Sequence, residues 1–214
     1  MKNLVLLFLL FTINLNAQII PFGFVKPWKT VTIGTQTWMA KNLDVVTYRN
    51  GDSIPQVTNA SVWAALTTGA WCWYNNDSAS YATLYGRLYN WFAVNDSRGL
   101  APLGFHIPSD VEWTTLRNTL GGSSLAGGKL KSISLWQSPN TGATNLSGFS
   151  GFPSGLINNN GIFSNIQNVG YWWSATEYTI KTSALYRYLN NTTSTLSGGY
   201  INKKNGMSGC LVLK

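Results

Sequence analysis

The clearest structural signal in the chain is the stretch GFHIPSDVEWTTLRNTLGG, residues 104–122. Ser109 follows Pro108 and stands three residues before Glu112, which is the S-x-x-E capping box of a helix start. The two glycines at the end of the stretch are typical of a helix stop. We therefore predict a helix over residues 109–120. Its apolar face consists of Val111, Trp113, Leu116 and Leu120.

The rest of the chain has the pattern of short strands and loops, with one further helix. Residues 84–94 predict this second helix, because apolar side chains recur there at helical spacing. Residues 127–155 are rich in Gly, Ser, Asn and Pro but carry spaced aromatic residues, which indicates a long ordered loop. Trp38, Trp91 and Trp113 are expected in the core. The expected strands are residues 30–33, 37–40, 70–74, 171–178, 184–190 and 207–213.

The composition is that of a globular protein with few surface charges. Only 10% of the 214 residues are charged, 14% are aromatic, and the formal net charge is +8. The aromatic content excludes a disordered chain, and the scarcity of Glu and Lys excludes a coiled coil. The positive charge is dispersed, because Lys203-Lys204 is the only basic doublet after residue 17. We therefore expect no nucleic-acid partner.

Residues 1–17, MKNLVLLFLLFTINLNA, have the arrangement of a signal peptide. Their apolar core, from Leu4 to Ile13, is too short to span a bilayer, and Ala17 provides a small residue for cleavage. We expect an exported chain that is secreted, held at the cell surface or periplasmic. Its mature part would consist of a lead-in at residues 18–24 and a domain at residues 25–214, with no transmembrane segment.

Side chains for catalysis or metal binding are scarce in this sequence. His106 is the only histidine, and the nearby Asp110 lies at the start of the predicted helix, where a carboxylate favours the helix dipole. Asp110 and Glu112 point to different faces of a helix, so capping explains them better than an acid–base pair does. We therefore predict no catalytic residue, no metal ligand and no cofactor.

The candidate ligand-binding segment is residues 184–204, ALYRYLNNTTSTLSGGYINKK. Two of its tyrosines share one face of the expected strand, and Tyr, Ser, Asn and Gly are the residue types of adaptable binding surfaces. The alternative is a plain polar loop between two strands. The residues predicted to contact a ligand are Tyr186, Tyr188, Asn190, Asn191 and Tyr200.

Seven segments of the chain together carry a resemblance to a known family. They are, in order, TVTIGTQTWMAKNL (30–43), YGRLYNWFAV (85–94), GFHIPSDVEW (104–113), GGKLKS (127–132), SPNTGATNLSGFSGFPSG (138–155), YWWSATE (171–177) and KKNGMSGC (203–210). These segments resemble the Fibrobacter succinogenes major paralogous domain. Proteins of this family are exported by bacteria, and their biochemical role is poorly defined.

The block GFHIPSDVEW also looks like the helix-start block of formylglycine-generating-type domains. That resemblance implies an α+β class with a C-type-lectin-like fold: two helices, a small twisted antiparallel sheet and a long ordered loop region. It does not carry the chemistry of those enzymes, which use a pair of neighbouring active-site cysteines. Cys72 and Cys210 are the only cysteines of this chain, and a fold alone does not set a function.

The same two cysteines raise the question of a disulfide. Export would place Cys72 and Cys210 in an oxidising space, where disulfides persist. The resemblance adds that the last strand of such a domain returns to the beginning of the fold. We therefore expect a Cys72–Cys210 bridge, and the alternative is a pair of small buried apolar side chains.

The sequence favours a secreted or surface-exposed, non-enzymatic binding module for an extracellular protein or glycan. Two alternatives stay open, namely an enzyme of formylglycine-generating or hydrolytic type and a structural envelope protein without a discrete ligand. The lack of a carboxylate pair, a usable cysteine pair and metal ligands in the sequence counts against the enzyme.

Overall fold

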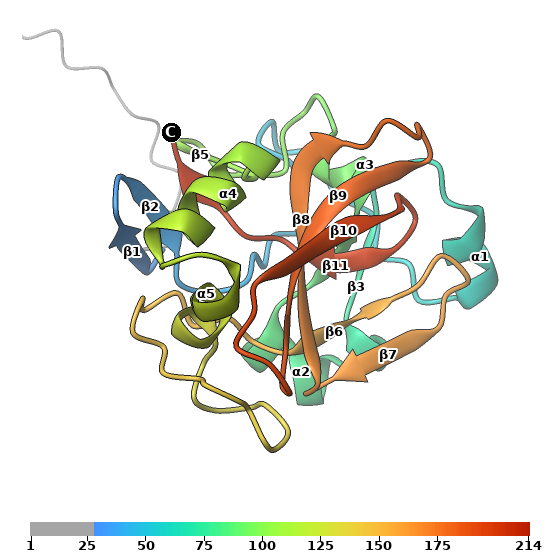
Figure 1. Cartoon of the computed structure of the whole chain (residues 1–214). Coiled ribbons are helices and arrows are strands. Elements are labelled where there is room, and N and C mark those ends of the chain that lie inside the picture. The colour runs from blue at the N-terminus through green and yellow to red at the C-terminus, as the bar shows by residue number, and fades with distance from the viewer. Residues whose placement is uncertain (1–27) are drawn as a thin grey trace, which may run out of the picture.

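Residues 28–214 are described by the computed structural model, and most of their regular structure is β-strand, in two sheets (Figure 1). The smaller sheet has the strand order β1 (Thr30–Ile33), β2 (Gln36–Met39), β12 (Val212–Leu213) and β5 (Phe105–His106). The larger sheet has the order β10 (Ser197–Asn202), β9 (Ser183–Asn190), β8 (Val169–Glu177), β6 (Ser154–Ile157), β11 (Gly206–Ser208), β4 (Leu88–Asn90) and β3 (Trp71–Cys72), with β7 (Phe163–Ile166) paired to β6.

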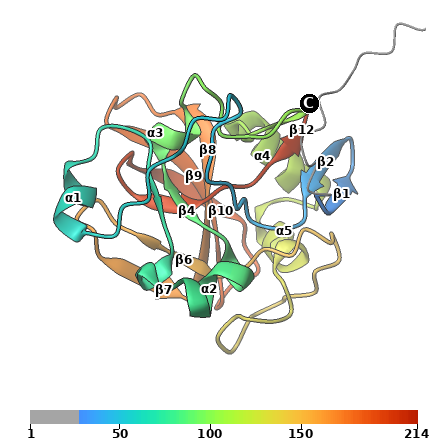
Figure 2. The same ribbon diagram turned by 180° about the vertical axis from the view of Figure 1, so that it is seen from behind.

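The helices are short and lie around the larger sheet. Seen from behind, the part of the chain that carries the first three helices lies in front of this sheet (Figure 2). No helix of residues 28–214 is long and apolar enough to cross a membrane. The helices are α1 (Ala60–Ala65), a 3-10 turn (Tyr74–Asn76), α2 (Ser78–Tyr85), α3 (Trp91–Val94), α4 (Asp110–Thr119) and α5 (Ser123–Leu130).

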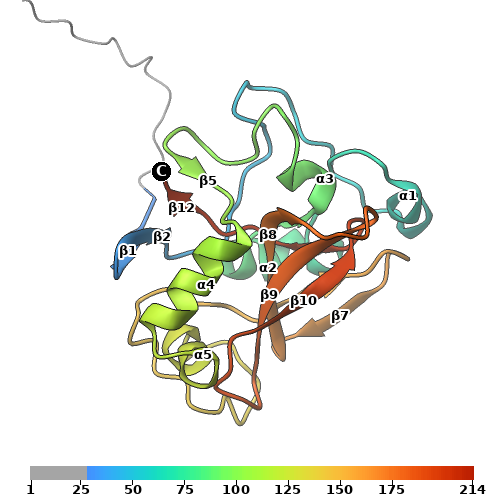
Figure 3. The ribbon, with the colours of Figure 1, turned by 45° about the horizontal axis from the view of Figure 1, so that its top comes forward.

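The helix predicted from the capping box is confirmed as α4. The Ser109 hydroxyl accepts a hydrogen bond from the Glu112 backbone N–H at 3.3 Å, and the Glu112 carboxylate accepts one from the Ser109 N–H at 2.7 Å. The helix lies between the two sheets (Figure 3), and Trp113 and Leu116 are fully buried. In this core Trp113 packs against Trp38 of β2, with ring centroids 4.9 Å apart.

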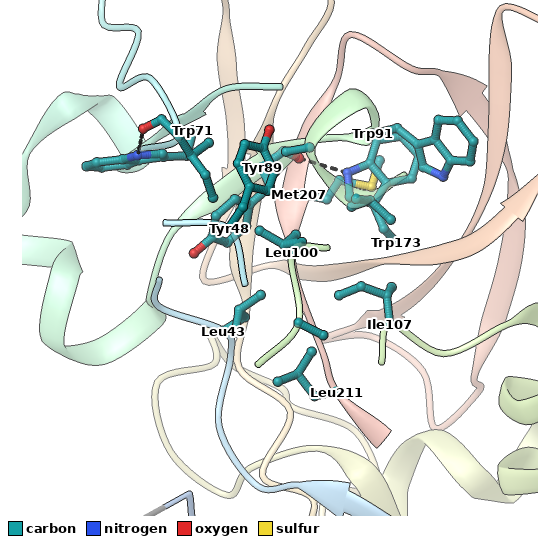
Figure 4. Packing of buried hydrophobic residues seen from close by; sticks show 14 of the residues in the cluster. Leu43, Tyr48, Trp71, Tyr89, Trp91, Leu100, Ile107, Trp173, Met207 and Leu211 are labelled. Carbon is teal, nitrogen blue, oxygen red and sulfur yellow. Dashed lines mark hydrogen bonds between the residues drawn. The ribbon is translucent and has the colours of Figure 1, made fainter. Parts of the chain in front are cut away.

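A second core lies on the other side of the larger sheet and is also aromatic (Figure 4). The Trp173 indole N–H donates to the Tyr89 carbonyl at 2.8 Å, and the Trp71 indole donates to the Ile54 carbonyl at 2.9 Å. These two buried indoles thus add apolar area without leaving their N–H groups unsatisfied. The predicted burial of Trp38, Trp91 and Trp113 is confirmed.

The predicted fold class is wrong for this chain. We expected two helices beside a small sheet, as in C-type-lectin-like domains, whereas twelve strands form sheets of four and eight within residues 28–214. The difference arises in segments rich in Gly, Asn and Ser, which had the composition of loops but form β6, β7 and β10. In β6 a glycine is needed because the paired strand β7 lies close: a Cβ at Gly155 would lie 2.5 Å from the Ser164 carbonyl oxygen.

The helix predicted over residues 84–94 is also wrong. The helix α2 ends at Tyr85, Gly86 takes a positive φ of 71°, and the next residues enter β4. The Asn90 side chain then starts α3, because its Oδ1 accepts hydrogen bonds from the backbone N–H groups of Ala70 and Ala93, both at 3.0 Å. The apolar spacing of this segment therefore reflects burial on a strand and a short helix, which together bury Leu88 and Trp91.

The expected disulfide is absent, because Cys72 and Cys210 are both free and buried. Cys72 lies in a cluster with Trp63 and Leu88, whereas Cys210 lies in the α4 core with Trp38. Burial raises the pKa of both thiols, so they are inert apolar side chains rather than reactive groups. The predicted signal peptide and lead-in, residues 1–24, lie outside the described residues.

Candidate functional site

The five residues predicted to contact a ligand lie on the hairpin β9–β10 and its turn, at the edge of the larger sheet. The pairing is antiparallel, with Tyr186 opposite Gly199 and Tyr200 opposite Leu185. Directly paired residues point to the same face of a sheet, and neighbours along a strand point to opposite faces. Tyr186 and Tyr188 therefore share one face, and Tyr200 lies on the other.

Three partly exposed tyrosines pack together on the first face, and we call them the tyrosine face: Tyr171, Tyr186 and Tyr188. Tyr171 of β8 is paired directly with Tyr188 of β9. The ring centroids lie 6.0 Å apart for Tyr171–Tyr186, 6.1 Å for Tyr171–Tyr188 and 5.8 Å for Tyr186–Tyr188. These separations are those of interacting aromatic pairs, so the three rings form one continuous surface.

The neighbouring strands position the tyrosine face without covering it. The Asn165 side-chain amide on β7 donates to the Tyr171 hydroxyl at 2.9 Å. On β10 the residues opposite Tyr186 and Tyr188 are Gly199 and Ser197, which have small side chains. A Cβ at Gly199 would lie 3.3 Å from the Tyr186 ring, so the ring extends over the glycine.

Two hydroxyls of this face, those of Tyr171 and Tyr186, are neutral at ordinary pH. Burial raises the pKa of Tyr171 to about 12 and opposes the Asn165 hydrogen bond, which lowers it. Burial, followed by the neighbouring Tyr188, also raises the pKa of Tyr186. Each of these two hydroxyls can therefore donate and accept a hydrogen bond near neutral pH, beside a large apolar ring.

The two predicted asparagines serve the turn that connects β9 to β10. The Asn190 Oδ1 accepts hydrogen bonds from the backbone N–H and the hydroxyl of Thr192, both at 2.8 Å. Asn191 is 7% exposed, and its amide donates to the carbonyls of Gln137 and Ser138 at 3.3 Å each. The structure therefore separates these residues from the tyrosine face and uses their side chains to hold the backbone.

A buried lysine fixes the same turn. The Lys131 ammonium is fully buried and donates to the carbonyls of Thr141, Asn190 and Thr193 at 2.8, 3.0 and 2.8 Å. Burial lowers the pKa of Lys131 to about 8, so the amine is still protonated at neutral pH and donates all three bonds. This lysine joins the loop after α5 to the β9–β10 turn.

Tyr200, the fifth predicted residue, belongs to a different pair. It is 52% exposed and stacks on Tyr178, with ring centroids 3.9 Å apart and an interplanar angle of 5°. Because it lies on the opposite face of the hairpin, it cannot join the three rings in one contact surface.

The only histidine is used at the start of α4. His106 Nε2 lies 2.6 Å from one Glu112 oxygen, and the Ser109 hydroxyl donates to the other at 2.8 Å. A Ser–His–Asp system needs a hydrogen bond between serine and imidazole, whereas this serine is bound to the carboxylate. Burial raises the pKa of Glu112, but the hydrogen bonds from Ser109 and His106 outweigh it and hold that pKa below its usual value. Within residues 28–214 no group of three or more His, Cys, Asp and Glu side chains could hold a metal ion.

The residues of the site that the sequence did not identify are Tyr171 and Asn165. The alternation of Tyr171 and Trp173 in YWWS indicated that both lie on one strand face. Nothing in the sequence, however, set the register that places Tyr171 opposite Tyr188.

Comparison with known proteins gives one match. The model of the Fibrobacter succinogenes major domain matches residues 31–208, which is most of the chain. No curated protein and no solved structure matches. The matched range includes every residue of the tyrosine face and of α4. This chain therefore belongs to the Fibrobacter succinogenes major domain family.

Proposed function

We propose that this protein is an exported, non-enzymatic binding module and that the tyrosine face contacts its ligand, an extracellular protein or glycan. The observation that carries the proposal is the packing of three partly exposed tyrosine rings, with centroids about 6 Å apart, on two paired strands of a large sheet. Export itself is inferred from residues 1–17.

Tyrosine suits such a surface for physical reasons. Its ring gives a large contact area at a low cost in conformational entropy, since only two side-chain torsions become fixed on binding. Its hydroxyl adds a hydrogen bond that an aliphatic side chain cannot make. Both protein backbones and sugars offer apolar patches beside polar groups, so either class of ligand fits this chemistry.

The surface is also fixed before a ligand arrives. β9 has a hydrogen-bonded neighbour on each side, Asn165 holds the Tyr171 hydroxyl, and Lys131 holds the turn beyond Tyr188. A ligand therefore meets rings that have already lost part of their freedom, which lowers the entropic cost of association.

The hydrolytic alternative would need His106 as its base. Its partner Glu112 also binds Ser109, so the three side chains stabilise the start of α4 and do not form a nucleophile–base pair. The formylglycine-generating alternative would need a cysteine pair, and Cys72 and Cys210 lie in separate cores.

An array of extracellular glycans and proteins, probed with the purified exported chain, tests the proposal. We expect at least one ligand, and we expect the Tyr186→Thr/Tyr188→Thr double variant to bind it at least about tenfold more weakly. Threonine keeps the strand preference and removes the ring. The matched control is Tyr200→Thr, which removes a ring from the same hairpin but from the opposite face.

Two results would contradict the proposal. One is an array on which the wild-type chain binds nothing, which would favour the structural envelope protein. The other is a double variant that binds as well as the Tyr200→Thr control does.

A further inference from the structure

A pocket lies apart from the three tyrosine rings, where the segment after α3 meets the end of β8. Its volume is about 330 Å³, at the lower end of the range for small-molecule sites. Leu100 and Ile107, two of its walls, belong to the aromatic core shown in Figure 4, so they are held firmly. The other residues that matter for its chemistry are Arg49, Ala101, His106 and Ala175.

The arginine of this pocket is held in one position by the backbone. Its Nε donates to the Ala101 carbonyl at 2.9 Å, and its Nη2 donates to the Phe105 carbonyl at 3.2 Å. The Arg49 backbone N–H also donates to the Gly99 carbonyl at 2.8 Å. Gly99 has a φ of +80°, and a Cβ there would lie 3.4 Å from Arg49 Cζ, so glycine lets the loop pass close to the guanidinium group.

No carboxylate of the described part of the chain pairs with this arginine, which is an exposed residue. Arg87, Arg98 and Arg187 each form an ion pair with an aspartate. Arg49 has no carboxylate within ion-pair distance among residues 28–214, and its Nη1 makes no hydrogen bond there. The carboxylate of Glu112, which binds the pocket residue His106, already accepts hydrogen bonds from that residue and from Ser109.

From this geometry we infer that the pocket is a second ligand site, which binds a small monocarboxylate with a short apolar tail. The guanidinium fork matches the two oxygens of a carboxylate and forms charge-assisted hydrogen bonds with them. Leu100, Ala101, Ile107 and Ala175 supply apolar walls for the tail. The positive charge of the chain as a whole, +8, also favours an anion.

Titration of the exported chain with a matched pair of probes tests this inference. The probes are 3-phenylpropionate and its neutral amide, 3-phenylpropanamide, followed by backbone amide NMR. We expect the carboxylate to bind at least about tenfold more tightly than the amide, because only the carboxylate pairs with the guanidinium charge. We expect the shifted signals at residues 49, 99–107 and 175.

Two variants test separately the charge of Arg49 and the free volume of the pocket. Arg49→Met removes the charge, whereas Ala175→Leu keeps Arg49 and fills the pocket, and both should abolish binding of 3-phenylpropionate. The control Arg117→Met removes an arginine from α4 that does not line the pocket, and it should leave binding unchanged.

Three outcomes would each overturn the inference: no binding of the carboxylate at millimolar concentrations, equal affinity for the amide, or shifted signals away from the pocket. The wild-type titration decides among them even if a variant fails to fold. The Tyr186→Thr/Tyr188→Thr variant should keep this site, so the tyrosine-face proposal and the pocket can fail independently.

Discussion

The two faces of β9 carry different side chains and lie in different surroundings. On the α4 side, Leu189 is buried beside Trp172, and Arg187 pairs with Asp110 of the helix. On the other side, Tyr186 and Tyr188 are only partly buried, and Tyr186 packs against the edge of the second core. One strand can therefore hold the fold together with one face and, in our proposal, present a ligand surface with the other.

The largest effect is expected on the α4 side. Trp172 is 1% exposed, packs against Phe149 with centroids 6.0 Å apart, and donates from its indole to Asn42 at 2.8 Å. Trp172→Ala should lower the free energy of unfolding by about 3–5 kcal/mol, as for other buried tryptophans. Urea unfolding measures this loss. The control Tyr188→Thr, on the other face, should cost about 1 kcal/mol or less, and equal losses would remove the distinction between the faces.

A smaller loss of unfolding free energy is expected at the turn between β9 and β10. Lys131→Met removes the buried ammonium and leaves three carbonyls without this donor, so the free energy of unfolding should fall by about 3 kcal/mol. Lys129 is a matched control two residues away, because among residues 28–214 its ammonium donates to one carbonyl, that of Leu120, at 3.1 Å. Urea unfolding of Lys131→Met and Lys129→Met that gave the same small loss would show that Lys131 does not hold the turn.

The pH dependence of stability sharpens the comparison on the tyrosine side. Burial raises the pKa of Tyr171 to about 12, above the value of about 10 for an exposed phenol. A pKa that is higher in the folded state stabilises the protein below pH 10, and this contribution is lost as the pH rises through 12. Tyr171→Phe should therefore reduce the alkaline loss of stability, measured by urea unfolding at several pH values. A Tyr171→Phe variant with the wild-type pH profile would show that burial does not raise the pKa of the Tyr171 hydroxyl.

Local signals in the sequence were enough to predict α4 and the β1–β2 hairpin. The capping box at Ser109 and the turn at Gly34 each depend on neighbouring residues, and both are confirmed. The helix predicted over residues 84–94 failed because Asn90 ends a strand and caps the next helix, with partners that lie at Thr68 and Ala70.

The candidate sites depend more strongly on distant pairing. The Gly198-Gly199 pair has the composition of a loop, yet it lies in β10 because Arg187 and Tyr186 of β9 extend over the two glycines. Tyr171 joins the tyrosine face because the strand register places it opposite Tyr188 of β9. Arg49 is held at its pocket because its side chain donates hydrogen bonds to carbonyls about 50 residues further along the chain. Spacing within one segment carries no information about such contacts.

The most direct test of the account is an NMR footprint of the tyrosine rings, with the ligand that the array selects. The chain is labelled at its tyrosine side chains, and the ring signals are followed as the ligand is added. The account predicts shifts of Tyr171, Tyr186 and Tyr188 together, while the stacked pair Tyr178 and Tyr200 stays unchanged. Shifts of Tyr178 and Tyr200 alone, with the three rings unchanged, would contradict it.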